Sequence, residues 1–189
     1  MVALIDACRR GELNATPIVI SNKEHAAGLD RARERNVQAI AIPSKGLSRD
    51  EHERLLLDAL KSNEVDFICL AGYMRLLGRS VVSEYRGRIL NIHPSLLPAF
   101  PGLDAQHQAL THGVKFSGCT VHFVDDGLDS GPIILQAVVP INDDDTEETL
   151  AVRILSQEHK LYTEAVKLVL SGNYRIEGRR VITNPPRGN

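Results

Sequence analysis

The sequence predicts an α/β domain in which helices flank a doubly wound, mostly parallel sheet, with antiparallel strands toward the C-terminus. In the first half, short and near-continuous apolar runs alternate with amphipathic segments, as strands covered on both faces require. Later, two apolar runs are joined by a short loop rich in Asp and Gly, which favours antiparallel pairing. With 189 residues, of which 43% are hydrophobic, the chain can bury one sizeable core. We therefore expect residues 1–189 to form a single domain.

The first half of the chain reads as repeated units of strand and helix. Its expected strands are 17–21, 37–43, 65–72 and 88–93, and its expected helices are 24–35, 49–62 and 79–86. Ser48, with Glu51 three residues later, forms a capping-box pattern that opens the second of these helices. The chain itself begins with a helix-like segment, MVALIDACRRG, whereas each later helix in this half follows a strand.

The second half has a different order of elements. They are a helix at 103–112, strands at 116–124 and 132–141, a helix at 146–171 and a hairpin at 174–183. Gly113 ends the first of these helices. Asp145, with Glu148 three residues later, is expected to open the long one. Residues 184–189 read as a loose tail.

Charge and hydropathy narrow the classes of partner. The formal net charge is −2 and the isoelectric point is near 6.4, so no overall electropositive surface is expected for a nucleic acid, although a local pocket for one phosphate stays open. No apolar run reaches the roughly 18 residues that a membrane-spanning helix needs. The expected partners are therefore small molecules rather than a nucleic acid or a membrane.

Cysteine and histidine spacing argues against metal and disulfide frameworks. Cys8, Cys69 and Cys119 are far apart, form no CxxC pair and are odd in number, which favours a reducing, cytoplasmic setting. His107 and His112 are five residues apart and do not share a helical face at the HExxH spacing, so no metal site is expected. The GxSxG elbow of a serine hydrolase is absent from the sequence.

The stretch NIHPSLLPAFPG brings two polar side chains to the end of a buried strand. Residues two apart in a strand point to the same side, so Asn91 and His93 share a face. Pro94 cannot continue a strand ladder, and Pro98 and Pro101 keep the following segment rigid. A doubly wound sheet binds its ligands outside the carboxyl ends of its strands, which is where this strand ends.

The side chains of Asn91 and His93 suit acyl transfer. An asparagine amide can donate a hydrogen bond to a developing oxyanion, and a histidine can donate to it or move a proton near neutral pH. For an isolated Asn-x-His pattern another interpretation stays open. The histidine is then a buried one satisfied by a carbonyl group, and the asparagine closes a turn.

The loop VDDGLDSGP holds three carboxylates between tight-turn residues. We expect Asp129 to approach the end of the strand, where a carboxylate would favour the protonated form of His93 and fix its tautomer. The alternative is an ordinary turn aspartate that accepts hydrogen bonds from its own loop.

The stretch LAGYMRLLG follows a buried strand. It combines the backbone freedom of Gly72 with one aromatic and three long apolar side chains, which suits a wall for a flat heterocycle. The alternative is that Met74, Leu76 and Leu77 only fill the core.

Four stretches, NIHPSLLPAFPG, LAGYMRLLG, GCTVHFVDDGLDSGPIILQ and QEHKLY, resemble the folate-dependent formyltransferases in nearly unbroken register. The Asn-x-His-Pro-Ser-Leu-Leu-Pro string with a downstream Leu-Asp-x-Gly is highly specific for this group. Chain length and the SQEHKLY helix point to its phosphoribosylglycinamide formyltransferase branch. The resemblance implies transfer of a formyl group from 10-formyltetrahydrofolate to the amine of glycinamide ribonucleotide in purine synthesis, without a metal.

The resemblance also implies the roles of the site residues. Asn91 would hold the formyl oxygen, His93 would stabilise the oxyanion and donate a proton, and Asp129 would keep His93 protonated and assist proton movement from the amine to the leaving nitrogen. The implied folate contacts are Arg49, Met74, Arg75, Leu76, Leu77, Asn91, Asp125, Asp126, Gly127, Leu128 and Asp129, and the implied nucleotide contacts include Pro94 and Glu158. Without the resemblance, Arg49 and Glu158 would read as surface charges.

The N-terminus departs from the pattern. Members of the family begin with a strand and a glycine-rich loop that holds the substrate phosphate, whereas this sequence begins inside the helix that follows. We expect that Met1 is internal to a longer protein. The absent strand would be an interior one, so its absence should expose backbone partners and apolar surface in the middle of the sheet.

Two alternatives to the glycinamide ribonucleotide reaction stay open. In the first, the same chemistry uses another acceptor: water in a deformylase, an amino sugar, or charged initiator tRNA, which the mild acidity disfavours. In the second, the chain is an inactive module that binds folate or a nucleotide. The sequence leaves the oligomeric state open.

Overall fold

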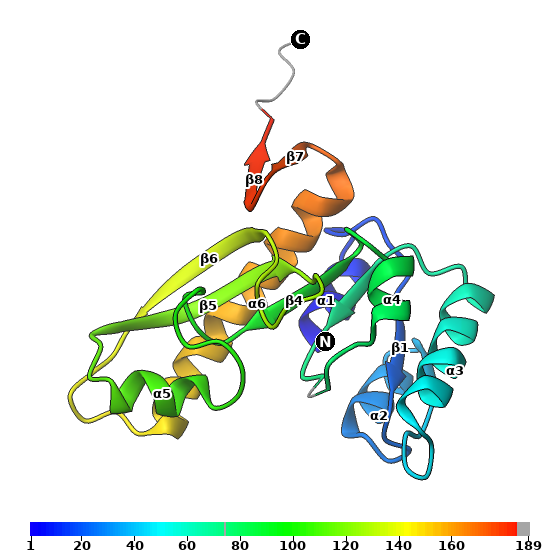
Figure 1. Cartoon of the computed structure of the whole chain (residues 1–189), viewed down its shortest axis with the longest axis horizontal. Helices are drawn as coiled ribbons and strands as arrows, with labels where there is room; N and C mark the ends of the chain where they lie inside the picture. Colours follow the sequence, from blue (N-terminus) through cyan, green and yellow to red (C-terminus); the bar gives the residue numbers. More distant parts are fainter. Residues whose placement is uncertain (74, 185–189) are drawn as a thin grey trace.

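A computed structural model describes residues 1–73 and 75–184, in which helices and strands alternate along most of the chain (Figure 1). The helices are α1 (Val2–Arg9), α2 (Ala27–Arg33), α3 (Arg49–Ser62), α4 (Arg79–Glu84), α5 (Ala105–Thr111) and α6 (Glu147–Ser171). The strands are β1 (Ile18–Ser21), β2 (Gln38–Ala41), β3 (Ile68–Leu70), β4 (Ile89–His93), β5 (Phe116–Phe123), β6 (Ile133–Pro140), β7 (Tyr174–Glu177) and β8 (Arg180–Thr183). The predicted α/β class is confirmed.

The strands form two hydrogen-bonded groups. β1 and β2 pair in parallel, and the other six strands lie in the order β3-β4-β5-β6-β8-β7. β3 and β4 are parallel, whereas β5 runs antiparallel to both β4 and β6, as predicted for the strands that flank the Asp/Gly-rich loop. The terminal hairpin of β7 and β8 extends the larger sheet through a parallel contact between β8 and β6.

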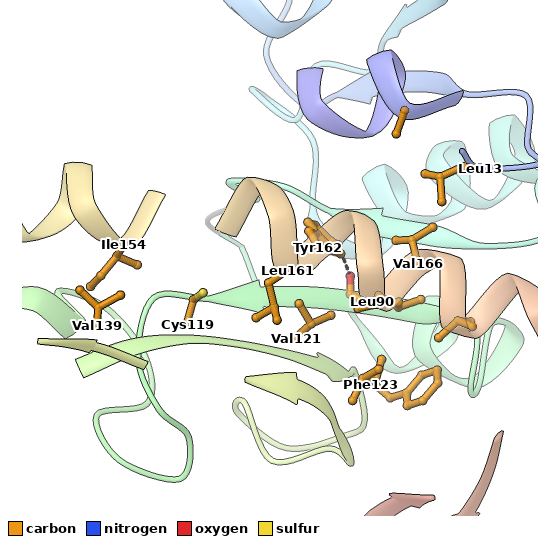
Figure 2. Close-up of a cluster of buried hydrophobic side chains, with 14 of the residues drawn as sticks. Leu13, Leu90, Cys119, Val121, Phe123, Val139, Ile154, Leu161, Tyr162 and Val166 are labelled. Atoms are coloured by element: carbon orange, nitrogen blue, oxygen red, sulfur yellow. Dashed lines mark hydrogen bonds between the residues drawn. The ribbon is translucent and has the colours of Figure 1, made fainter. Parts of the chain in front are cut away.

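Helix α6 packs along the larger sheet and supplies much of its core (Figure 1). Its buried side chains recur three and four residues apart, as an amphipathic helix requires. They are Leu150, Ile154, Leu161, Tyr162, Ala165, Val166 and Val169. Figure 2 shows Leu161 and Val166 facing strand residues such as Leu90 and Val121.

The hydroxyl of Tyr162 ties α6 to two strands. It lies 2.9 Å from the carbonyl oxygen of Leu70 in β3. It also lies 3.0 Å from the carbonyl oxygen of Leu90 in β4 (Figure 2). Burial raises the pKa of this phenol well above its usual range, so it remains a hydrogen-bond donor at all ordinary pH values. Tyr162 therefore fixes the strand that carries Asn91 relative to its neighbour.

A second apolar cluster lies under α3 and α4. Its buried members are Ile42, Leu56, Leu60, Val81, Val82, Tyr85 and Ile89. Ile20 of β1 and Ile40 of β2 pack against it, as do Ile68 of β3 and Leu77. The cluster therefore joins the two-stranded sheet to the first strands of the larger one.

A large cavity separates the two sheets. Within the described residues, β1 pairs only with β2 and β3 pairs only with β4, so each has one edge without a strand partner. The cavity has a volume of about 1820 Å³ and is lined by Ile18 and Ile20 on one side, by Ile68 and Leu70 on the other, and by Met1. Each of these unpaired strand edges therefore borders a cavity lined by apolar side chains.

One predicted helix start is wrong by one residue. The N-cap of α6 is Thr146, whose side chain accepts from the Thr149 amide while the Thr149 hydroxyl accepts from the Thr146 amide. Asp145, the predicted cap, makes a bidentate ion pair with Arg153 instead, with both N–O distances at 2.7 Å. A bidentate pair with a guanidinium is stronger than a neutral cap, so it decides where this carboxylate points.

Candidate active site

The site begins where β4 ends. Pro94 lacks an amide proton, so the ladder stops at His93, as predicted. Asn91 and His93 lie on the same face of β4, because they are two residues apart. The antiparallel register with β5 places His122 directly opposite Asn91. The Asn91 amide nitrogen lies 3.3 Å from His122 Nε2.

His93 is held between two oxygen atoms. Its Nε2 donates to the carbonyl oxygen of Phe100 at 2.8 Å, and its Nδ1 lies 3.3 Å from Asp129 Oδ2. A neutral imidazole can donate from only one nitrogen, whereas an imidazolium donates from both. Nε2 therefore carries a proton, and the Asp129 carboxylate lies beside Nδ1.

The loop after β4 is anchored to the neighbouring strands. The Thr120 hydroxyl donates to the Ser95 carbonyl at 2.6 Å and accepts from the Leu97 amide at 3.0 Å. The Gln136 side-chain amide donates to the Leu97 carbonyl at 2.9 Å. Phe100 has a φ of +53°, a left-handed conformation that is strained for a bulky residue. These contacts hold the Phe100 carbonyl in place against His93.

Asp129 closes the site from the opposite loop. Its Oδ2 accepts from the Gly102 amide at 2.9 Å, which joins the loop after β5 to the loop after β4. Its φ of +47° is left-handed, and its side chain is only 12% exposed. The His122 ring beside it, the Gly102 amide and His93 hold the pKa of the Asp129 carboxyl below its usual range, so Asp129 is ionised at neutral pH. The 3.6 Å between His122 Nε2 and Asp129 Oδ1 is too long for a strong hydrogen bond.

Asp125 shapes the loop that presents Asp129. Its Oδ1 accepts from the Ser130 hydroxyl at 2.7 Å and from the Gly127 amide at 3.1 Å. A Cβ atom at Gly127 would collide with the Ser130 hydroxyl, so a larger residue there would move Ser130 away from Asp125. Asp125 and Asp129 therefore do different things: the first closes the turn and the second faces β4.

His122 is a site residue that the sequence analysis did not identify. It is buried, and its Nδ1 donates to the Phe123 carbonyl at 2.8 Å. This turns Nε2 toward the Asn91 amide nitrogen at 3.3 Å and toward Asp129 Oδ1 at 3.6 Å, so the ring lies between these two side chains. The strand pattern of 116–124 indicates that His122 shares a face with Thr120. Only the cross-strand register, which is not local in sequence, brings it to Asn91.

The residues predicted to contact folate fall into two places. Leu128 is 55% exposed and lies beside Gly102, and Asp126 forms a surface ion pair with Arg86 at 3.5 Å. Arg49 opens α3 and donates to the carbonyl of Leu76, which is 66% exposed.

The rest of the predicted 74–77 wall is divided between core and surface. Leu77 is partly buried and packs against the second cluster. Arg75 is exposed, and Met74 lies outside the described residues.

The two residues predicted to contact the nucleotide lie on different elements. Pro94 follows β4 directly and is partly buried. Glu158 lies on α6, where burial raises the pKa of its carboxyl while the α-amino group of Met1 opposes that shift. A partly buried carboxylate can accept a hydrogen bond from a ligand hydroxyl.

Within residues 1–73 and 75–184, no group of three or more His, Cys, Asp or Glu side chains is arranged to hold a metal ion. Over the same residues, no helix has the length and apolar character needed to cross a membrane.

Comparison with known proteins places the chain among formyl-transferring enzymes. A family model described as "Formyl transferase" matches residues 1–166. Phosphoribosylglycinamide formyltransferase of Escherichia coli (strain K12) is 40% identical over 195 residues, covering 98% of this chain and 91% of that protein. Trifunctional purine biosynthetic protein adenosine-3 of Drosophila melanogaster is 48% identical over 178 residues, but the match covers 92% of this chain and only 13% of that protein.

A solved structure agrees with these relatives. The crystal structure of glycinamide ribonucleotide transformylase 1 from Symbiobacterium toebii is 50% identical, with a TM-score of 0.94. The match covers 97% of this chain and 88% of that one.

Proposed function

Because this chain belongs to the formyl transferase family, we propose that it transfers a formyl group from 10-formyltetrahydrofolate to the amine of glycinamide ribonucleotide, a step of purine synthesis. The observation that carries the proposal is that Asn91 and His93 share one face at the end of β4, with the Asp129 carboxylate 3.3 Å from the His93 ring. An amide and an imidazole side by side can donate to one oxygen, and the carboxylate can hold the positive charge of the ring.

The reaction follows from these groups. The substrate amine attacks the formyl carbon, and the carbonyl electron pair moves onto oxygen, so the transition state carries a developing oxyanion. Asn91 and His93 donate to that oxygen. The amine then loses a proton, and N10 of the folate gains one as its bond to the formyl carbon breaks. His93 moves the proton between the two nitrogens, and Asp129 assists by stabilising the imidazolium throughout.

The long contact between His93 and Asp129 makes this step feasible. Charge-assisted N–H···O bonds are about 2.7 to 2.9 Å long, whereas Nδ1 and Oδ2 are 3.3 Å apart. The bond from Nε2 to Phe100 is short at 2.8 Å. Nδ1 is therefore the nitrogen that can share its proton with a substrate oxygen while the ring stays anchored through Nε2.

The remaining predicted contacts complete the proposal. The folate lies between the Asp125 to Asp129 loop, which ends in the exposed Leu128, and the segment that Arg49 holds at Leu76. The nucleotide lies near Pro94 and Glu158. We also propose that the protein is cytoplasmic, where its three cysteines would stay reduced. We propose further that its substrates are small molecules and that residues 1–189 form one domain.

Steady-state turnover of 10-formyltetrahydrofolate to tetrahydrofolate, followed by absorbance with and without glycinamide ribonucleotide, tests this function. We expect turnover that requires the amine. Asn91→Ala and His93→Ala should each lower the rate by about 10²- to 10³-fold while the melting temperature stays near that of the parent chain.

Three results would point elsewhere. Equal turnover without the amine, with release of formate, would indicate a deformylase. Turnover only with an amino sugar would indicate a different acceptor. Folate binding without turnover on any acceptor would indicate a binding module.

A further inference from the structure

Arg49 occupies an unfavourable position for a cation. It is the first residue of α3, where the partial positive charge of the helix N-terminus repels a guanidinium. Its partner Glu53 lies four residues later, and this order of charges stabilises a helix less than the reverse order. Residues that disfavour their own helix are expected at functional sites. The reason for an arginine at the start of α3 therefore lies outside the helix.

Glu53 connects α3 to the segment that precedes and opens α4. Its side chain is 11% exposed, and its Oε1 accepts from Arg49 Nε at 2.9 Å. Its Oε2 accepts from the Ser80 hydroxyl at 2.8 Å. A Cβ atom at Gly78 would collide with this carboxylate, so the backbone of Gly78 lies directly against it. A buried carboxylate requires such partners, because an unpaired one is strongly disfavoured.

Arg49 extends the same connection to the exposed wall of the site. Its Nη2 donates to the Leu76 carbonyl at 3.3 Å. The segment from Leu76 to Ser80 is thus held at three points, and Glu53 contacts two of them directly and the third through Arg49. A guanidinium has five N–H donors; within residues 1–73 and 75–184 two of them are used, so three remain on a side chain that is 54% exposed.

We infer that Glu53 is a positioning residue for the folate substrate: it holds the Arg49 guanidinium and the Leu76 segment in the arrangement that receives the carboxylate-bearing folate. The inference rests on the proposed function. Glu53 itself touches no substrate. It fixes Arg49 at Nε, which leaves the Nη groups to face an anion, and it keeps exposed Leu76 next to them.

Glu53→Gln tests this role, because it keeps the shape of the side chain and removes its charge. We expect the KM for 10-formyltetrahydrofolate to rise about tenfold, with kcat and the KM for glycinamide ribonucleotide within about twofold of the parent values. Glu51→Gln is the matched control. It removes the same charge from the same helix and weakens its cap, but Glu51 contacts Ser48 rather than the Leu76 segment. An equal rise in KM for both variants would mean that only the stability of α3 matters and would overturn the inference.

A double-mutant cycle separates positioning from a general loss of structure. Because Glu53 acts partly through Arg49, adding Glu53→Gln to Arg49→Met should raise the KM for the folate by a smaller factor than it does in the parent chain. Two fully multiplicative effects would overturn the inference.

The test does not depend on catalysis alone. Binding of tetrahydrofolate, measured by calorimetry on the four chains of the double-mutant cycle and on Glu51→Gln, should give the same pattern. If folate binding by these variants follows this pattern but the parent chain transfers no formyl group, the proposed reaction is wrong while the role of Glu53 stands.

Discussion

Asp129→Asn removes one negative charge from the centre of the site and preserves its shape. Asp129 Oδ2 lies 3.3 Å from His93 Nδ1, and the two side chains are 12% and 5% exposed. At this separation, opposite unit charges attract by about 5 kcal/mol for an effective dielectric constant of about 20. The amide that replaces the carboxylate keeps an oxygen that can accept from the Gly102 amide, so the two loops stay joined.

The rate should fall strongly, because His93 must carry positive charge as the oxyanion forms. If about 3 to 4 kcal/mol of the attraction is lost in the transition state, kcat drops by about 10²- to 10³-fold. The measurement is kcat for formyl transfer at pH 7.5, with the melting temperature as the check on folding. Asp143→Asn is the matched control, since Asp143 is an exposed partner of Lys115. If kcat of Asp129→Asn stayed within about threefold of the parent value in a folded chain, the electrostatic role of Asp129 would be refuted.

Three further predictions concern stability. The pKa of the Asp129 carboxyl is lower in the folded chain than in the unfolded chain. Its contribution to the free energy of unfolding is therefore complete above the ordinary value near 4 and is lost as the pH falls through the folded pKa. The unfolding free energy of the parent, measured with denaturant, should fall more steeply below about pH 4 than that of Asp129→Asn. Tyr162→Phe leaves the Leu70 and Leu90 carbonyls without their phenol donor and should lower the unfolding free energy by about 1 to 3 kcal/mol, and a change below about 0.5 kcal/mol would contradict the bridging role. An apolar segment of strand length joined ahead of Met1 should raise the melting temperature by pairing with the free edges of β1 and β3, whereas a segment with alternating prolines should not, and equal shifts for both would count against pairing.

Local signals in the sequence were sufficient to predict most elements. The capping box of Ser48 and Glu51 predicts α3 at 49–62, and the observed helix has these bounds because both cap bonds are formed within the segment itself. Pro94 predicts the end of β4 for an equally local reason. Where a long-range partner competes, local signals fail, and Asp145 pairs with Arg153 instead of capping α6.

Only part of the candidate site could be predicted from local signals in the sequence. Asn91 and His93 follow from strand alternation, and the approach of Asp129 follows from a tight loop after β5. His122 and Glu53 were missed because their partners come from other elements: the β4 and β5 register for the first, and the packing of α4 on α3 for the second. Nor does any local pattern fix the Phe100 carbonyl against His93, since this depends on anchoring by Thr120 and its neighbours.

The most direct measurement is formyl transfer by His93→Ala with and without Asp129→Asn. We propose that Asp129 acts on the reaction through the charge of the His93 ring. Once the ring is gone, removing the carboxylate should change the remaining kcat by less than about threefold, although it costs about 10²-fold or more in the parent chain. If the two losses multiplied instead, the carboxylate would act on the substrate independently of His93, and the arrangement at the end of β4 would not be the catalytic unit.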